Sequence, residues 1–218
     1  MSVENFNDLA KRAQAICEKL KELYPDAVCQ LKASTPWQLL VATVLSAQCT
    51  DERVNKITPP LFARWPDAKS LALAKVTDLE EMIRSAGFFR NKAKNLLAAA
   101  ERLVQVYGGE LPHTLAELMT LPGVARKTAN VVLFGAFGLN EGLAVDTHVK
   151  RIAYRLGLTT STNPLQVEKD LLPLFPKEEW GRTNHRLVLF GREVCKARNP
   201  KCLACKLAKL CPQNKPPS

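Results

Sequence analysis

The stretch LPGVARKTANVVLFGAFG, Leu121–Gly138, gives the clearest indication of how this chain folds. A short amphipathic segment, TLAELMT, runs into Pro122-Gly123, and a second helical pattern begins at about Ala125. Gly123 permits a backbone with positive φ, so the stretch predicts two helices joined by a tight turn. Such a turn presents backbone amides beside a helix N-terminus, where an anion such as a DNA phosphate can bind. Leu-Pro-Gly alone also fits an ordinary corner between two helices.

Lys127 distinguishes this turn from an ordinary corner. A cation in the first turn of a helix opposes the helix dipole, and here Arg126 is its neighbour in the sequence. Residues placed against local preference are candidates for function. Neighbouring positive charge and partial burial favour the neutral amine, which is the nucleophilic form. We therefore consider Lys127 a candidate nucleophile.

Helical periodicity extends over almost the whole chain. Thr35 precedes Pro36 in the pattern of an N-cap, and Gly87 and Gly108 stand where two helical patterns end. These signals predict an all-α protein of about ten short helices joined by Pro/Gly turns, with no strand and no repeat. Because no linker divides the sequence, a second lobe would have to be built from segments far apart in the chain.

Composition points to a polyanionic partner. The 218 residues carry a net charge of +10 and a pI of about 9.4, which is typical of nucleic-acid-binding proteins, although a soluble basic protein without such a partner would look the same. No apolar run is long enough to span a bilayer, and the N-terminus lacks the apolar core of a signal peptide, so we expect a cytoplasmic protein without a membrane partner. From residue 192 onwards the sequence contains one acidic residue, Glu193, and seven basic ones, so the positive charge is partly concentrated there: Arg192, Lys196, Arg198, Lys201, Lys206, Lys209 and Lys215.

The segment AVDTHVKRIAYRLG, Ala144–Gly157, predicts a helix that begins after Asp146. The aspartate follows apolar residues and has the position of an N-cap. A capping carboxylate is held rigidly and kept ionised by helix amides, so the same residue is also a candidate catalytic group. It follows Lys127 by nineteen residues, and two antiparallel helices could bring both to one cleft. His148 is more simply explained as a structural hydrogen-bonding residue.

Four cysteines lie close together in CKARNPKCLACKLAKLC, with the spacing C-x6-C-x2-C-x5-C: Cys195, Cys202, Cys205 and Cys211. Zinc is the commonest metal for four cysteines, but its usual pattern pairs two C-x2-C units across a longer loop. One compact loop with a single C-x2-C is more typical of an iron–sulfur cluster held at four corners. The spacing thus favours iron and leaves zinc as the alternative. Cys17 and Cys49 are expected to be buried apolar residues.

Together, the hairpin LPGVARKTANVVL, the aspartate in VDTH and the C-x6-C-x2-C-x5-C spacing resemble the endonuclease III family of DNA glycosylases. The three motifs occur in the family's order and at similar separations, and the resemblance covers essentially the whole chain. It implies two helical lobes flanking a DNA-binding cleft. A six-helix barrel would span residues 24–137, with a helix–hairpin–helix at about 118–137. The other lobe would combine residues 1–23 with 138–218 and hold one 4Fe–4S cluster on the four cysteines.

The resemblance also implies an activity. The family excises oxidised pyrimidines in base excision repair and then nicks the strand by β-elimination 3′ to the abasic site. Lys127 matches the nucleophile that forms a Schiff base, and Asp146 matches the carboxylate. In LSAQCTD, Gln48 matches the residue that fills the gap left by a flipped nucleotide. In GFFRNKA, Phe88 matches the position of the intercalating wedge.

The expected partner is double-stranded DNA with oxidised pyrimidines or abasic sites, and we expect a monomer. Contacts to the DNA backbone are expected from the hairpin and from the longest gap between the cysteines: Gly123, Ala125, Lys196, Arg198 and Lys201. Two positions depart from the family pattern. The hairpin usually reads G-V-G, so a methyl group at Ala125 would alter the local backbone or the approach of phosphate. The wedge is often leucine, and Phe88 is bulkier. These motifs do not specify which lesions are preferred, since that depends on pocket shape.

Two other functions fit parts of the sequence. A monofunctional mismatch adenine glycosylase would share the hairpin, aspartate and cluster, but such relatives lack the lysine and continue into another domain, whereas this sequence stops seven residues after Cys211. A non-catalytic DNA-binding module would hold zinc in the cysteines and use Lys127 as a phosphate contact. Colour separates the second from an iron–sulfur protein, because a zinc protein is colourless.

Overall fold

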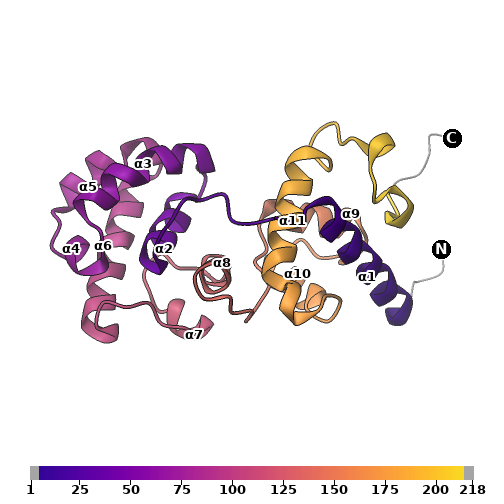
Figure 1. Ribbon diagram of the computed structural model, residues 1–218, viewed down its shortest axis with the longest axis horizontal. Coiled ribbons are helices and arrows are strands. Elements are labelled where there is room, and N and C mark those ends of the chain that lie inside the picture. Colours follow the sequence, from indigo (N-terminus) through magenta and orange to yellow (C-terminus); the bar gives the residue numbers. More distant parts are fainter. Residues whose placement is uncertain (1–4, 214–218) are drawn as a thin grey trace. The chain divides into compact units, whose positions relative to one another are not determined.

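The computed structural model describes residues 5–213, and within this range every regular element is a helix (Figure 1). The expected all-α fold is confirmed. The chain divides into two compact units: a middle unit, Cys29–Glu141, and a terminal unit built from Met1–Val28 and Gly142–Ser218. The expected boundaries, after residues 23 and 137, precede these by five and four residues. None of the helices in the described range is both long and apolar enough to cross a bilayer.

The middle unit contains seven α-helices and one 3₁₀ turn: α2 (Pro36–Leu45), α3 (Asp51–Arg64), α4 (Ala68–Ala72), α5 (Val76–Met82), η1 (Arg84–Ala86), α6 (Phe89–Tyr107), α7 (Leu115–Leu118) and α8 (Arg126–Phe137). Helix α2 is apolar and almost wholly buried, and it packs against α8, while α6 packs against α4. Gly135 permits the close approach of α2 and α8, because a Cβ there would lie 2.7 Å from Cδ2 of Leu39. The hairpin helix α8 is therefore fixed by the core of this unit.

The terminal unit joins the first helix to the last part of the chain: α1 (Phe6–Leu23), α9 (Thr147–Arg155), α10 (Pro164–Leu171), η2 (Lys177–Glu179), α11 (Trp180–Glu193), η3 (Cys202–Ala204) and η4 (Ala208–Leu210). Helix α11 packs against both α1 and α9. Gly191 allows α9 to approach, since a Cβ at this position would lie 2.6 Å from Nδ1 of His148. Helix α11, which leads into the cysteine loop, is thus tightly packed on α9.

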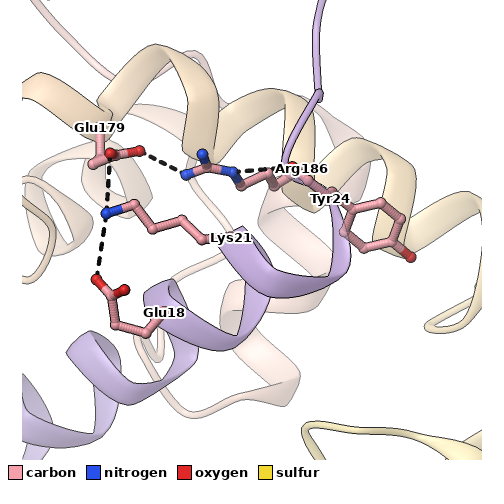
Figure 2. Close-up of polar contacts among 5 residues, drawn as sticks. All are labelled: Glu18, Lys21, Tyr24, Glu179 and Arg186. Carbon is pink, nitrogen blue, oxygen red and sulfur yellow. Dashed lines mark hydrogen bonds and ion pairs between the residues drawn. The ribbon is translucent and has the colours of Figure 1, made fainter.

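An ion-pair network with a buried centre at Arg186 and Glu179 ties α1 to α11 within the terminal unit (Figure 2). The Arg186 guanidinium donates to Glu179 at 2.6 Å, and Lys21 lies 3.2 Å from the other oxygen of that carboxylate. Lys21 also pairs with Glu18 at 3.4 Å, and Arg186 donates to the carbonyl of Tyr24. Burial raises the pKa of Glu179, but the hydrogen bonds from Arg186 and Lys21 outweigh burial and lower the pKa of that carboxyl overall.

The predicted helix ends are mostly confirmed. Thr35 caps α2 by accepting from the amide of Gln38 at 3.2 Å, and Gly108 ends α6 in the left-handed conformation with φ 65°. The helix predicted to reach Gly87 is instead two elements, because α5 ends at Met82 and η1 continues to the glycine. Cys17 is buried as expected, but Cys49 lies beyond the end of α2 and is only half-buried at the edge of the core.

Candidate active site

The hairpin turn has the conformation that the sequence predicts. Gly123 has φ 78°, and a Cβ on it would lie 2.8 Å from Cβ of Asn95 in α6, so both backbone and space require glycine. Ala125 is the N-cap residue of α8 with φ −82° and ψ 165°, an extended conformation that any residue adopts. The alanine therefore introduces no backbone strain, which excludes one of the two effects expected of its methyl group.

Lys127 is the second residue of α8 and is half-buried. The amides in the first turn of a helix have no carbonyl partners within that helix. No side chain caps this end and no acid lies in its first turn. The helix dipole therefore acts on the lysine without a compensating carboxylate from α8 itself. In the middle unit, the Lys127 amine and the uncapped start of α8 thus lie close in sequence to the exposed turn at Gly123.

Asp146 caps α9 in the terminal unit. Its Oδ1 accepts from the Val149 amide at 2.8 Å, and its carbonyl accepts from the Lys150 amide at 3.0 Å. The residues before it are buried, and the carbonyl of Ala144 accepts a hydrogen bond of 2.7 Å from the side chain of Asn184. These contacts fix the backbone on both sides of a half-buried carboxylate. His148 contacts Arg151 at 3.1 Å, consistent with a structural role.

Two arginines near the end of α9 bind the segment that carries the first cysteine. Arg151 donates from Nε and Nη2 to the carbonyl of Cys195, at 3.1 and 3.0 Å, and from Nη2 to that of Gly191. Arg155 donates to the carbonyls of Lys196 and Ala197, at 2.7 and 3.1 Å. One short helix therefore carries Asp146 at its start and anchors the cysteine loop at its end.

All four C-terminal cysteines line one cavity of ≈ 230 Å³, together with Arg155, Phe190 and Leu156 among others. In the described range, no three His, Cys, Asp or Glu side chains converge as the ligands of a single ion. Cysteine thiolates bind both zinc and iron–sulfur clusters, so the chemistry of the lining fits a metal centre. Arg155 also lies 3.5 Å from Sγ of Cys195, which places a positive group beside a sulfur ligand candidate.

The basic residues of the cysteine loop point outward. Lys196, Arg198 and Lys201 are all exposed, whereas the carbonyls of Lys196 and Ala197 are bound by Arg155. Asn199 adopts φ 51°, and the Lys201 amide donates to the carbonyl of Val194 at 3.0 Å. The loop therefore has a fixed backbone beneath three cationic side chains.

Comparison with known proteins decides which family combines these features. Residues 41–177 match the HhH-GPD superfamily of base excision DNA repair proteins. Over 202 residues the chain is 56% identical to endonuclease III of Synechocystis sp., covering 93% of this chain and 92% of the relative. The chain belongs to the endonuclease III family. The predicted resemblance is thereby confirmed.

Further members of the endonuclease III family agree with this assignment. Endonuclease III of Bacillus subtilis is 44% identical over 202 residues, covering 92% of each chain. Two solved structures of 44% sequence identity each cover 94% of this chain and 96% of their own. One is a non-covalent endonuclease III–DNA complex with a TM-score of 0.89, and the other is a trapped endonuclease III–DNA covalent intermediate with a TM-score of 0.90.

The two residues that match the gap-filler and wedge of the endonuclease III family lie on strained turns of the middle unit. Gln48 has φ 53° and Phe88 has φ 47°, left-handed conformations that cost a non-glycine residue roughly 1–3 kcal/mol each. Both side chains are exposed, and that of Phe88 is 64% accessible, whereas Phe89 packs against the core. Strain and exposure together are typical of functional positions.

Sequence reasoning did not find Lys92, Arg151, Arg155 or Asn184. Lys92 is buried in α6, with Nζ donating to the carbonyls of Leu45, Ala47 and Ala86. The pattern of α6 contained a signal for it, because Lys92 falls on the same helical face as buried Ala99 and Leu96, where a surface lysine would not be placed. The arginines of α9 gave no such signal, since charged residues on a short helix are usually solvent-exposed.

Proposed function

We propose that this chain is a bifunctional DNA glycosylase and abasic-site lyase that removes oxidised pyrimidines from double-stranded DNA. Membership of the endonuclease III family supports base excision repair as the process. A relative of 44% identity has been trapped as a covalent intermediate with DNA, which supports a covalent mechanism. The observation that carries the proposal within this chain is the half-buried amine of Lys127 at the start of the hairpin helix.

Lys127 is the proposed nucleophile. Its neutral amine attacks C1′ of the damaged nucleotide, a C1′–N bond forms, and the glycosidic bond breaks with its electron pair leaving on the base. Opening of the sugar gives a Schiff base between the lysine and C1′. The Schiff base draws electrons from C2′, so loss of a proton there expels the 3′ phosphate by β-elimination. Hydrolysis then returns the free lysine.

Asp146 is the proposed carboxylate of the reaction. Its N-cap geometry fixes the orientation of the carboxylate, as a group that receives a proton or stabilises developing positive charge requires. We propose that it assists deprotonation of Lys127 and stabilises the cationic sugar as the base departs. The Val149 amide donates to Oδ1, so Oδ2 is not needed for the cap.

Extrusion of the damaged nucleotide is assigned to Gln48 and Phe88. Unstacking a base costs a few kcal/mol, and a lesion reduces that cost. The exposed ring of Phe88 would enter the stack as an apolar wedge, and the amide of Gln48 would occupy the vacated position. The hairpin at Gly123 and Ala125 would bind a backbone phosphate through its amides. Lys196, Arg198 and Lys201 would contact further phosphates.

We propose one 4Fe–4S cluster on Cys195, Cys202, Cys205 and Cys211. The cavity lined by all four thiols supports it, as does the anchoring of their loop by Arg151 and Arg155. When bound, the cluster would cross-link the loop that presents the basic residues, and it takes no part in bond breaking. Iron and acid-labile sulfide analysis of protein purified without oxygen tests this, and stoichiometric zinc with a colourless protein would contradict it.

Borohydride trapping tests the enzymatic proposal directly. The substrate is duplex DNA with one thymine glycol, and the wild type is compared with Lys127→Gln. We expect a covalent protein–DNA adduct with the wild type alone, because reduction fixes only an imine. A folded wild type that traps neither thymine glycol nor a bare abasic site would refute the lyase mechanism. An adduct formed equally by the variant would refute the assignment to Lys127.

A further inference from the structure

Lys92 joins the two turns that carry Gln48 and Phe88. Its Nζ donates to Leu45 at 2.8 Å, to Ala47 at 2.7 Å and to Ala86 at 2.8 Å, in each case to the backbone carbonyl. An ammonium group has three N–H donors, so these contacts use its whole capacity. The side chain is only 6% exposed. A lysine buried to this extent is rare unless it has a specific role.

The three acceptors lie beside the strained positions. Ala47 directly precedes Gln48, and Ala86 is separated from Phe88 by Gly87 alone. The Lys92 amide also donates to the carbonyl of Phe88 at 3.1 Å. Left-handed conformations of non-glycine residues persist only where surrounding contacts hold them. The contacts of Lys92 reach both turns, which are separated by about forty residues of chain.

Burial lowers the pKa of Lys92, while the nearby Cys49 acts in the opposite direction. Desolvation therefore opposes the charged form, and the three carbonyls compensate it by accepting hydrogen bonds from the ammonium. An apolar residue at this core position would avoid the cost of desolvation. A lysine at this position is therefore explained by the two turns whose carbonyls it binds, and not by the burial of its side chain.

We propose that Lys92 is a positioning residue that holds Gln48 and Phe88 in a fixed mutual arrangement, so that wedge and gap-filler enter the duplex together. The inference rests on the roles proposed above for those two residues. It predicts that Lys92 contributes to base extrusion and has no part in the chemistry at C1′. Steps that need no extrusion should then be independent of it.

The test compares Lys92→Met with Lys94→Met, an exposed lysine two residues further along α6. Single-turnover excision of thymine glycol from duplex DNA should fall by about tenfold or more in Lys92→Met, because displaced groups lose contact with their target. The fluorescence rise of 2-aminopurine placed opposite the lesion should be lost. Borohydride trapping on a single-stranded abasic site, which has no base to extrude, should stay at the wild-type rate. Lys94→Met should resemble the wild type in all three assays.

A double-mutant cycle separates positioning from general destabilisation. In a Gln48→Ala, Phe88→Ala background, Lys92→Met should have no further effect on excision, although it still lowers thermal stability. Lys92→Gln, which is shorter but retains donors, provides a milder variant if Lys92→Met does not fold, and it should show the same split between duplex excision and single-strand trapping.

Three results would overturn the inference alone. They are a parallel loss of excision and single-strand trapping, an equal effect of the lysine substitution in both backgrounds, and full excision activity in the folded Lys92→Met protein. Full activity of the Gln48→Ala, Phe88→Ala protein would instead overturn the proposed roles of those residues, and the inference with them. Absence of trapping by the wild type would overturn the proposed lyase function before Lys92 is considered.

Discussion

Asp146 accepts a hydrogen bond of 2.8 Å from the amide of Val149, so the proposed catalytic carboxylate is also the N-cap of α9. A cap is a structural role, and catalysis is a chemical one. The two roles can be separated because asparagine caps a helix about as well as aspartate but carries no charge.

Asp146→Asn should therefore slow base excision strongly while changing the free energy of unfolding little. Asp146→Ala should lose the cap as well and destabilise the protein by about 1 kcal/mol. Excision rates under single turnover and chemical denaturation of both variants check this. If Asp146→Asn excised the base at the wild-type rate, the catalytic role of Asp146 would be refuted and only its capping role would remain.

Substitution of Lys127 should abolish strand cleavage without weakening the fold. A cation in the first turn of α8 opposes the helix dipole, so Lys127→Gln should stabilise the protein by up to about 0.5 kcal/mol. Lys127→Arg is the matched control, because arginine keeps the positive charge but forms no Schiff base with the sugar. Both variants should still bind lesion-containing DNA in gel-shift assays, and nicking by either one would contradict the proposed nucleophile.

Gly123→Ala should destabilise the hairpin for two reasons. The alanine would have to adopt φ 78°, and its Cβ would lie 2.8 Å from Cβ of Asn95. We expect a loss of about 2 kcal/mol. Ala125→Gly is the control in the same turn, and at φ −82° it should change stability by less than about 1 kcal/mol. Thermal unfolding of the two variants measures the difference, and equal Tm values would contradict the strained geometry of the turn.

Acid should weaken the terminal unit through Glu179. The pKa of this carboxyl is lowered below its ordinary value of 4.5, so its contribution is present above that pH and is lost as the pH falls through the folded-state value. Glu179→Gln should flatten the dependence of stability on pH below 4.5, and it should cost roughly 3 kcal/mol at neutral pH because Arg186 stays buried. Denaturation at several pH values measures both effects, and an unchanged acid dependence would exclude Glu179 as its source.

The hydrogen bond to Glu179 raises the pKa of Lys21, which gives the opposite dependence. Its contribution is complete below the ordinary value of 10.5 and is lost as the pH rises through the folded-state value. Glu179→Gln should reduce this alkaline loss, and Glu18 would keep a smaller part of it because it also raises the pKa of Lys21. An alkaline loss as large in the variant as in the wild type would exclude the Lys21–Glu179 pair as its source.

Neutralising the exposed charges of the cysteine loop should weaken DNA binding in a salt-dependent manner. With Lys196, Arg198 and Lys201 replaced by glutamine, the slope of log K against log salt should decrease by about 2–3, roughly 0.9 per lost phosphate contact. The control replaces three other exposed lysines of the terminal unit: Lys11, Lys169 and Lys177. An unchanged slope for the loop variant would remove this loop from the DNA interface.

Much of the candidate site could be predicted from the sequence because its signals are local. The Pro-Gly break fixes the hairpin turn, the position of Asp146 after an apolar run fixes a cap, and the spacing of four cysteines limits them to one loop. Such features depend on neighbours within a few residues, where backbone geometry and capping chemistry operate. Gln48 and Phe88 were found only through family resemblance, and their left-handed backbones were not predicted, because local preference disfavours that conformation for both residue types.

Tertiary packing alone decided the role of Lys92 and of the arginines in α9. In the sequence Lys92 is one more lysine in a basic chain, and only the convergence of α2, η1 and α6 brings three carbonyls to its ammonium. Arg155 likewise has no sequence signal, since its acceptors in the cysteine loop lie some forty residues away. The sequence by itself determined the helices, the turn, the cap and the cysteine spacing. The tertiary structure decided which buried charges hold those parts in place, because a hydrogen bond depends on distance in space and not on separation along the chain.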